Sequence, residues 1–288
     1  MMRRKWIVLL LVALAAAPLA RGEVSVDADG SGAARSLVLM YRQATGGGGD
    51  DPDPWVLVRS HVLSSWVLNP DGGRRTHPDG WPSLGWDPVG NTPEVTWARH
   101  DGNDYEIVVA RWEDGHWTDP VALTDDGTDD REPEIAYAPD GTARITFWRG
   151  DQVYLVTRPP GGSWSAPELV DAGVRSSVTA STEDRVAWQR DGTDGTTEIV
   201  AAEKVAGGWV PTVLASTSFA GLDGTGDIDV RLEGTGTKVW VAWEDSADSL
   251  GWCELLPGGT WSAPRYEPLA GPDDEEAARF RIRLQALR

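Results

Sequence analysis

The sequence "GSWSAP" at residues 162–167 returns as "GTWSAP" at residues 259–264. Two variants of this phrase, "GHWTDP" at 115–120 and "GGWVP" at 207–211, occur elsewhere in the chain, and a weaker copy, "SSWVLNP", contains Trp66. The tryptophans of the phrases are 45 to 52 residues apart. A repeat of this length is typical of a solenoid, a propeller or another array of equivalent units.

Three short segments with apolar residues near every second position precede each phrase. In the unit that contains Trp164 they are "PEIAYAP", "ARITFWR" and "QVYLVTRP". Such β-branched and aromatic segments predict strands, and Asp-Gly or Gly-Gly pairs at 113–115, 139–141, 160–162 and 257–259 predict tight turns between them. Each unit is therefore expected to form four antiparallel strands, with the repeated phrase at the turn between the third and the fourth strand.

Repeated four-stranded sheets of this size predict an all-β protein, a β-propeller of five four-stranded blades over residues 23–270. A ring of six blades, with one blade split between the termini, is the alternative. A polar linker and a strand, "FRIRLQAL", within residues 271–288 are expected to help close the ring. Seven tryptophans are expected to pack in the core: Trp97, Trp117, Trp164, Trp188, Trp209, Trp243 and Trp261.

The first 22 residues read as a secretory signal peptide, because a basic start is followed by a short apolar run and small residues. Removal of residues 1–22 changes the net charge from −19 to −23, because Arg3, Arg4, Lys5 and Arg21 are lost. We expect a secreted or periplasmic protein with no membrane insertion after cleavage. An acidic surface repels nucleic acid. The single cysteine, Cys253, lies in an apolar run and is expected to be buried and inert.

The units resemble the blades of bacterial sialidase-superfamily (BNR-like) propellers, in which a G-x-W-S-x-P phrase follows the third strand. The resemblance covers nearly all of residues 24–270. The Asp-box pattern S-x-D-x-G-x-x-W and the Arg-Ile-Pro motif of true sialidases do not occur in this sequence. The resemblance implies the propeller fold, and it adds glycoside hydrolysis to the activities that need consideration.

Long, acidic loops join the second strand to the third in each unit and join one unit to the next, and they share one face of a propeller. Function is expected on that face. The candidate ligand-binding residues are Arg99, Arg149, Arg190, Asp101, Asp104, Asp191, Asp245, Trp81 and Trp86. The arginines end the second strands and could grip a carboxylate with two parallel hydrogen bonds, as the arginine cluster of true sialidases does. Alternatively they form ion pairs across the strands, such as Arg99 with Glu106 and Arg190 with Glu198.

Four carboxylates at the channel end of the first strands are the alternative catalytic set: Glu132, Glu134, Asp227 and Asp229. Paired carboxylates can act as general acid and base on a glycosidic bond. The Asp-rich loops could instead bind calcium, through Asp27, Asp29, Asp125, Asp126 and Asp129. No other cofactor is indicated.

The sequence thus favours an exported, non-enzymatic propeller that binds a glycan, a polymer or a protein partner through its acidic loop face. A glycoside hydrolase that uses the carboxylates of the central channel is the alternative. A propeller fold does not decide between these functions, because propellers support many chemistries.

Overall fold

The protein is all-β in a computed structural model that describes residues 24–28, 37–42, 54–60, 62–67, 79–114, 116–172, 178–179, 184–192, 195–219, 230–235, 238–246 and 249–268. For residues 24–80 the structure describes the backbone alone. Among the described residues, no helix has the length and apolar character that crossing a lipid bilayer requires. The signal peptide and the closing strand predicted at residues 1–22 and 271–288 lie outside the described residues.

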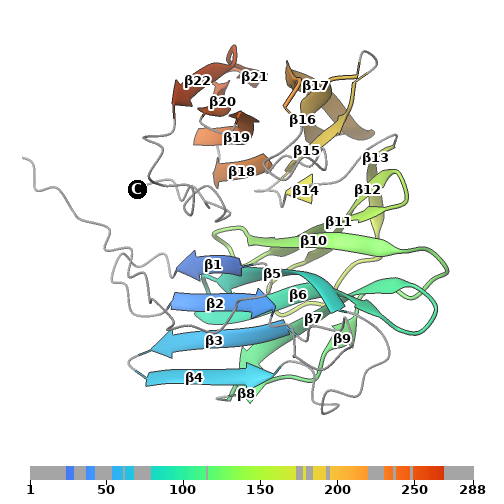
Figure 1. Cartoon of the computed structure of the whole chain (residues 1–288), viewed down its shortest axis with the longest axis vertical. Coiled ribbons are helices and arrows are strands. Elements are labelled where there is room, and N and C mark those ends of the chain that lie inside the picture. The colour runs from blue at the N-terminus through green and yellow to red at the C-terminus, as the bar shows by residue number, and fades with distance from the viewer. Residues whose placement is uncertain are drawn as a thin grey trace, which may run out of the picture.

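The described strands form five antiparallel sheets, and the first four strands of each sheet are neighbours in chain order (Figure 1). In the two five-stranded sheets the last strand pairs with the third, β9 with β7 and β22 with β20. The first sheet comprises β1 (Val24–Ala28), β2 (Leu37–Arg42), β3 (Pro54–Ser60) and β4 (Val62–Val67). The second comprises β5 (Asp79–Asp87), β6 (Thr92–His100), β7 (Tyr105–Glu113), β8 (His116–Trp117) and β9 (Val121–Ala122). The third comprises β10 (Asp130–Tyr137), β11 (Ala143–Arg149), β12 (Gln152–Arg158) and β13 (Glu168–Ala172).

The last two sheets continue the same order. The fourth comprises β14 (Val178–Thr179), β15 (Arg185–Asp191), β16 (Thr197–Val205) and β17 (Gly208–Thr217). The fifth comprises β18 (Val230–Thr235), β19 (Lys238–Ser246), β20 (Ser249–Leu256), β21 (Thr260–Trp261) and β22 (Arg265–Pro268). The first strands of neighbouring sheets touch in succession, β1 with β5, β5 with β10, β10 with β14 and β14 with β18. This is the arrangement of a β-propeller, as the repeat predicts, with the first strand of each sheet innermost; the number of blades in the closed ring stays a prediction.

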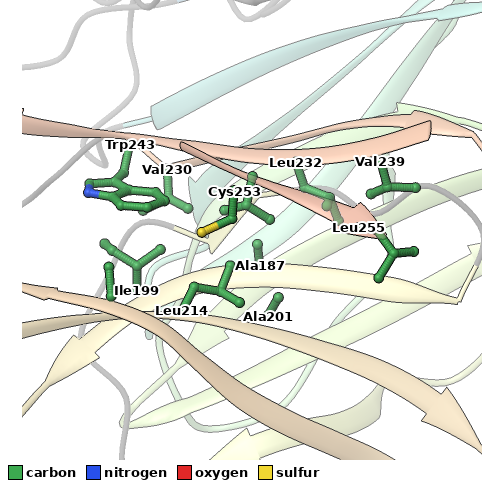
Figure 2. Close-up of a cluster of buried hydrophobic side chains, with 12 residues drawn as sticks. Ala187, Ile199, Ala201, Leu214, Val230, Leu232, Val239, Trp243, Cys253 and Leu255 are labelled. Carbon is green, nitrogen blue, oxygen red and sulfur yellow. The ribbon is translucent and has the colours of Figure 1, made fainter. Parts of the chain in front are cut away.

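Neighbouring sheets bury their apolar faces against each other. Between the fourth and fifth sheets, Ile199 and Leu214 face Val230, Trp243 and the thiol-bearing Cys253 (Figure 2). Equivalent clusters lie between the second and third sheets and between the third and fourth. Burial raises the pKa of the Cys253 thiol to about 11, which fits the inert cysteine expected from the sequence.

The tryptophans divide into two groups. Trp97, Trp188 and Trp243, on the second strands, are fully buried, which confirms the expected core packing. The tryptophans of the repeated phrase are half-buried and cover the edges of the same clusters; they are Trp117, Trp164, Trp209 and Trp261. The phrase thus closes the outer rim of each core rather than its centre.

The hydroxyl residue after the phrase tryptophan makes the same pair of hydrogen bonds in three sheets. The Ser165 N–H donates to the Thr157 carbonyl at 2.8 Å, and Ser165 Oγ accepts the Thr157 N–H at 3.0 Å. Ser262 does the same with Glu254, and Thr118 with Arg111. One residue thereby satisfies both backbone groups of the third strand where the fourth strand leaves the sheet. In "GGWVP" a valine stands in its place, and there β17 runs unbroken for 10 residues.

Replacement of Ser165 by Ala removes the acceptor of the Thr157 N–H. We expect Ser165→Ala to lower the free energy of unfolding by about 1 kcal/mol. Urea denaturation followed by tryptophan fluorescence measures the difference. Ser163→Ala, an exposed position in the same turn, serves as the control and should be neutral; equal effects of the two changes would show that the hydroxyl pairing contributes nothing.

Gly251 on β20 lies flat against the indole ring of Trp243, and a Cβ at this position would overlap that ring. Because Trp243 is buried, the ring cannot swing aside, and we expect Gly251→Ala to cost about 1–3 kcal/mol. A matched change, Gly127→Ala, places a methyl group where no atom lies within 4 Å and should be neutral. Thermal unfolding of the two variants compares them; an unchanged melting temperature for Gly251→Ala would contradict the packing described.

Candidate functional site

The predicted functional face holds the loops between second and third strands and the links between sheets, and we call it the loop face. Its best-described part comprises residues 101–104 between β6 and β7, residues 123–129 between β9 and β10, and residues 150–151 between β11 and β12. The opposite face carries the tight turns inside each sheet, and we call it the turn face. Most of the predicted site residues that the structure describes lie on the loop face.

A buried ion pair anchors the loop face to the third sheet. The Arg149 guanidinium donates from Nε and Nη2 to the two carboxylate oxygens of Asp130, both at 2.7 Å, and Nη2 also lies 2.7 Å from Asp126 Oδ2. Asp130 is 0% exposed. Its burial raises the pKa of the Asp130 carboxyl, although the Arg149 hydrogen bonds act in the opposite direction. Arg149 is thus engaged in the cross-strand pairing that the sequence offered as the alternative to ligand binding.

The other two predicted arginines occupy equivalent positions. Arg190 forms the pair expected from the sequence, with Nε 2.7 Å from Glu198 Oε2, and its Nη1 lies 3.6 Å from Asp171. Arg99 lies opposite Glu106 in the β6–β7 register, with its guanidinium carbon 5.1 Å from the centroid of the Trp97 ring. The second strands of the second, third and fourth sheets therefore each carry an arginine at the last or next-to-last position, and this arginine lies against its own sheet.

Three carboxylates converge at the β6–β7 hairpin. One carboxylate oxygen from each of Asp101, Asp104 and Glu106 lies within 4.8 Å of those of the other two. Asp101 is exposed, whereas Asp104 is 6% and Glu106 3% exposed. Burial raises the pKa of Glu106, and the nearby charges of Asp130 and Asp104 act in the same direction. Asp101 and Asp104 were predicted as ligand-binding residues; Glu106 was expected only as an ion-pair partner.

Matching β-bulges mark the innermost strands of the second and third sheets. The β5–β6 register shifts between Gly80 and Ser83, and the β10–β11 register shifts between Arg131 and Glu134. Inside these bulges, Trp81 and Glu132 both have φ of 51°, which is uncommon for residues other than glycine. The two residues occupy the same position in successive units, each directly before a proline. Backbone strain of this kind gathers at functional sites.

Beside the bulges lies a group of half-buried aromatic and charged side chains. Trp81 and Tyr105 meet edge to face with ring centroids 5.5 Å apart, and the Arg131 guanidinium carbon lies 5.5 Å and 5.0 Å from the two rings. Asp129 holds this arginine with an oxygen 2.5 Å from Nη2 and accepts the Tyr105 N–H at 3.0 Å. We call Trp81, Tyr105, Asp129 and Arg131 the aromatic–arginine group. The sequence singled out Trp81, and Asp129 as a calcium ligand, but not Tyr105 or Arg131.

The structure describes only some of the carboxylates predicted as catalytic or calcium-binding residues, and it does not bring those together in one site. Glu134 is buried between β5 and β10, where Ser83 Oγ donates to its Oε2 at 2.8 Å and also accepts the Ile135 N–H at 3.2 Å. Glu132 is half-buried in the bulge next to Arg131. Asp227, Asp229 and Asp29 lie outside the described residues, and only the backbone of Asp27 is described. Asp125 and Asp191 are exposed on the loop face, and Asp245 is half-buried there.

Trp86 is not brought together with Trp81. It lies at the other end of β5, where its Nε1–H donates to Asn91 Oδ1 at 3.2 Å in the turn into β6. The turn face near it contains a buried pairing of Arg158 with Glu94, in which two guanidinium nitrogens lie 2.7 Å and 2.6 Å from the carboxylate oxygens and the Tyr137 hydroxyl also donates to Glu94. This network ties β12 and β10 to β6 of the preceding sheet.

The turn face also has a cavity of about 350 Å³ between the third and fourth sheets. Arg144, Asp184, Lys204 and Trp209 are among the residues that line it. The Trp209 indole is held in place by its Nε1–H, which donates to Glu168 at 3.1 Å. The turn face is therefore not featureless, although the sequence predicted function on the loop face alone.

The comparisons with known proteins identify the fold. No protein-family model matches the chain, and no curated protein matches it. A Hadza microbial sialidase superposes with a TM-score of 0.57 at 11% identity, over 86% of this chain but only 58% of the sialidase. A PL25 polysaccharide lyase, an ulvan lyase, superposes with a TM-score of 0.55 at 12% identity, over 86% of this chain and 70% of the lyase. A lectin of Aleuria aurantia in complex with Fucα1-6GlcNAc superposes with a TM-score of 0.51 at 13% identity, over 86% of this chain and 79% of the lectin. The chain has the fold of these proteins.

The buried pair of Arg149 and Asp130 predicts a large effect of an uncharged replacement. In Arg149→Met the carboxylate of Asp130 loses its partner in a site without solvent, and we expect a loss of about 3–5 kcal/mol in unfolding free energy. Arg265→Met is the control, because the Arg265–Glu254 pair is exposed and 3.4 Å long; its loss should cost about 1 kcal/mol or less. Denaturation of both variants at neutral pH measures these values, and similar losses for both would contradict the difference in burial.

Proposed function

We propose that the protein is an exported, non-enzymatic glycan-binding propeller and that the glycan binds the loop face at the aromatic–arginine group. The observation that carries this proposal is the Arg131 guanidinium, which lies within 5.5 Å of the ring centroids of both Trp81 and Tyr105. All three side chains are half-buried, so each keeps surface for a ligand. They lie where the innermost strand β10 begins, at the level of the two bulges.

The chemistry of the group suits a sugar ring. A tryptophan offers a large rigid surface at low conformational cost, and the C–H face of a pyranose can cover it. Arg131, Asp129 and Glu132 bring donors and acceptors to the edge of that surface, as a small number of well-placed polar groups does in most ligand sites. The pairing of Arg131 with Asp129 fixes the direction of the guanidinium before a ligand arrives, which lowers the entropy cost of binding.

The fold and the charge both support this class of ligand. The structural neighbours include a sialidase, a lyase named for a polysaccharide and a lectin solved with a disaccharide. With a net charge of −19, the chain disfavours polyanionic ligands and tolerates neutral or basic ones. A neutral glycan therefore fits the loop face best.

The positions of the carboxylates support binding rather than hydrolysis. A glycosidase of the usual kind needs two carboxyl groups that flank the bond, about 5–10 Å apart, one of them acting as a proton donor. Glu134 lies buried between two sheets and accepts the Ser83 hydroxyl. Among the described members of the predicted catalytic set, Glu132 is the one next to the aromatic–arginine group, directly after Arg131 in the chain; Asp227 and Asp229 lie outside the described residues. A glycoside hydrolase remains the alternative function, and the test below distinguishes the two.

A glycan-array screen of the purified protein, followed by calorimetry on the best ligand, tests the proposal. We expect Trp81→Ala to weaken binding by roughly tenfold or more, since the loss of a stacking surface is worth about 1.4 kcal/mol. Trp209→Ala is the matched control, because Trp209 is also a half-buried indole but lies on the turn face. Loss of binding in Trp209→Ala with full binding in Trp81→Ala would move the site to the turn-face cavity and contradict the proposal.

The same preparation should be assayed against a panel of chromogenic glycosides. We expect no turnover. Turnover that Glu132→Gln abolishes and Trp209→Ala leaves intact would establish the hydrolase instead. The glutamine keeps the size of the side chain, so a change in rate reports the lost carboxylate rather than altered packing.

A further inference from the structure

The acidic group at the β6–β7 hairpin has features that the glycan proposal does not use. Asp101, Asp104 and Glu106 come from one turn and the first residues of the strand that follows it. The turn is shaped by Asp101 Oδ1, which accepts the Asn103 and Asp104 N–H groups at 2.7 Å and 3.3 Å. Asp104 and Glu106, which follow this turn, are both buried.

Two carboxylate oxygens in this group are buried without a partner. Asp104 Oδ2 and Glu106 Oε2 have no hydrogen bond to any described residue, and neither atom has appreciable contact with solvent. The other oxygen of each group is occupied, by the Asn103 side-chain amide at 3.1 Å and by the Asp126 N–H at 2.8 Å. An unpartnered oxygen of a buried carboxylate costs several kcal/mol unless a donor or a cation meets it.

Positive side chains nearby have other contacts. Arg149 holds Asp130 and Asp126. Arg131 holds Asp129. The Arg99 guanidinium lies over the Trp97 ring. Asp130, which is fully buried, lies in the same region, because Arg149 holds it together with Asp126 and the Asp126 N–H donates to Glu106. The hairpin is therefore a place where buried negative charge exceeds the positive charge that the described side chains bring to it.

We propose that Asp101, Asp104 and Glu106 bind a calcium ion. All three ligand atoms are carboxylate oxygens, which hard cations prefer, and the group contains no nitrogen or sulfur ligand. Two oxygens that bind one Ca²⁺ at 2.3–2.6 Å can be at most about 5.2 Å apart, so oxygens within 4.8 Å of each other fit around it. Mg²⁺ demands near-octahedral geometry and gives up its water ligands reluctantly, so a group of three protein carboxylates suits Ca²⁺ better. Water molecules complete the coordination.

The ion would connect two loops of the loop face. Glu106 accepts the Asp126 N–H, and Thr124 Oγ1 accepts the Ile107 N–H at 2.9 Å, so the hairpin already contacts the link between the second and third sheets. Tyr105, a member of the aromatic–arginine group, lies between Asp104 and Glu106 in the chain. A calcium ion here would fix the hairpin that carries Tyr105. This site differs from the Asp-rich loops at 27–32 and 125–132 in which the sequence suggested calcium.

Calorimetric titration of chelator-treated protein with Ca²⁺ in 150 mM NaCl tests the proposal, together with a thermal melt. We expect one saturable site with a Kd of roughly 10⁻⁵ to 10⁻³ M, as in extracellular modules. At a hundred times Kd, the melting temperature should rise by about 5 °C. Mg²⁺ at the same concentration should compete poorly. Tb³⁺ should bind in place of Ca²⁺ and show luminescence sensitised by Tyr105.

The variants decide which residues bind the ion. Glu106→Gln and Asp104→Asn keep size and remove charge, and each should weaken Ca²⁺ binding at least tenfold. Asp101→Asn is the variant with least risk to folding, because Asp101 is exposed and an amide oxygen can still accept the two backbone N–H groups. Asp151→Asn, an exposed carboxylate in the corresponding hairpin of the third sheet, is the matched control and should bind Ca²⁺ normally.

Any of three results would overturn the proposal. One is the lack of saturable Ca²⁺ binding by the unaltered protein up to 10 mM, about ten times the weakest Kd expected. The second is normal Ca²⁺ binding in Asp101→Asn. The third is loss of binding in Asp125→Asn alone, which would place the ion in the Asp-rich link instead. None of these results depends on glycan binding, so failure of this proposal and failure of the proposed function can be told apart.

Discussion

The second, third and fourth sheets each have two apolar faces, and the fold depends on covering both. In the second sheet, Ala98, Ile107 and Val109 point toward the third sheet, while Val95 and Trp97 point the other way. Because successive side chains of a strand alternate between faces, a four-stranded meander cannot hide both sets of apolar residues by itself. Packing each sheet on the next solves this problem without adding helices. The buried tryptophans of the second strands fill the space between twisted sheets, where smaller residues would leave cavities.

The repeated phrase has a different structural role, which is to satisfy backbone groups and cover the core at the outer edge of the sheet. There the fourth strand begins beside the third but soon departs, and a strand that departs leaves backbone groups of its neighbour unpaired. Ser165, Ser262 and Thr118 each satisfy two such groups, with one N–H and one hydroxyl. Val210 has no hydroxyl, and around it the fourth strand stays paired by its backbone instead. The tryptophan before this residue then covers the cluster that the departing strand leaves open. The phrase thus has two structural roles in the units that contain its hydroxyl residue, hydrogen bonding to the third strand and covering the cluster.

The alternating apolar residues and the Gly-containing turns were enough to predict the strands and turns from the sequence. The Asp-Gly turn at 139–141 appears where expected, with Gly141 at a positive φ and its N–H bonded to Ala138. The Arg190–Glu198 pair followed from the register of a single hairpin. Contacts between sheets could not be predicted from the sequence, because they depend on how two segments that are distant in the chain pack together. The Ser83–Glu134 bond and the Glu94–Arg158 pair are of this kind. Trp86 shows the same limit: five residues of strand, about 16 Å, separate it from Trp81 and place it at the far end of the sheet.

The loop face concentrates negative charge because the scaffold does not need those loops for its core. The arginines near the ends of the second strands in the second, third and fourth sheets offset part of this charge, as Arg149 does for the buried Asp130. Arg99 lies against an aromatic ring, as Arg149 does, and the three acids of its hairpin outnumber it. The proposed calcium and glycan sites then share one physical origin. Loops freed from packing gather carboxylates; in the proposed site a calcium ion would order them, and the ordered hairpin would hold Tyr105 against Trp81 and Arg131.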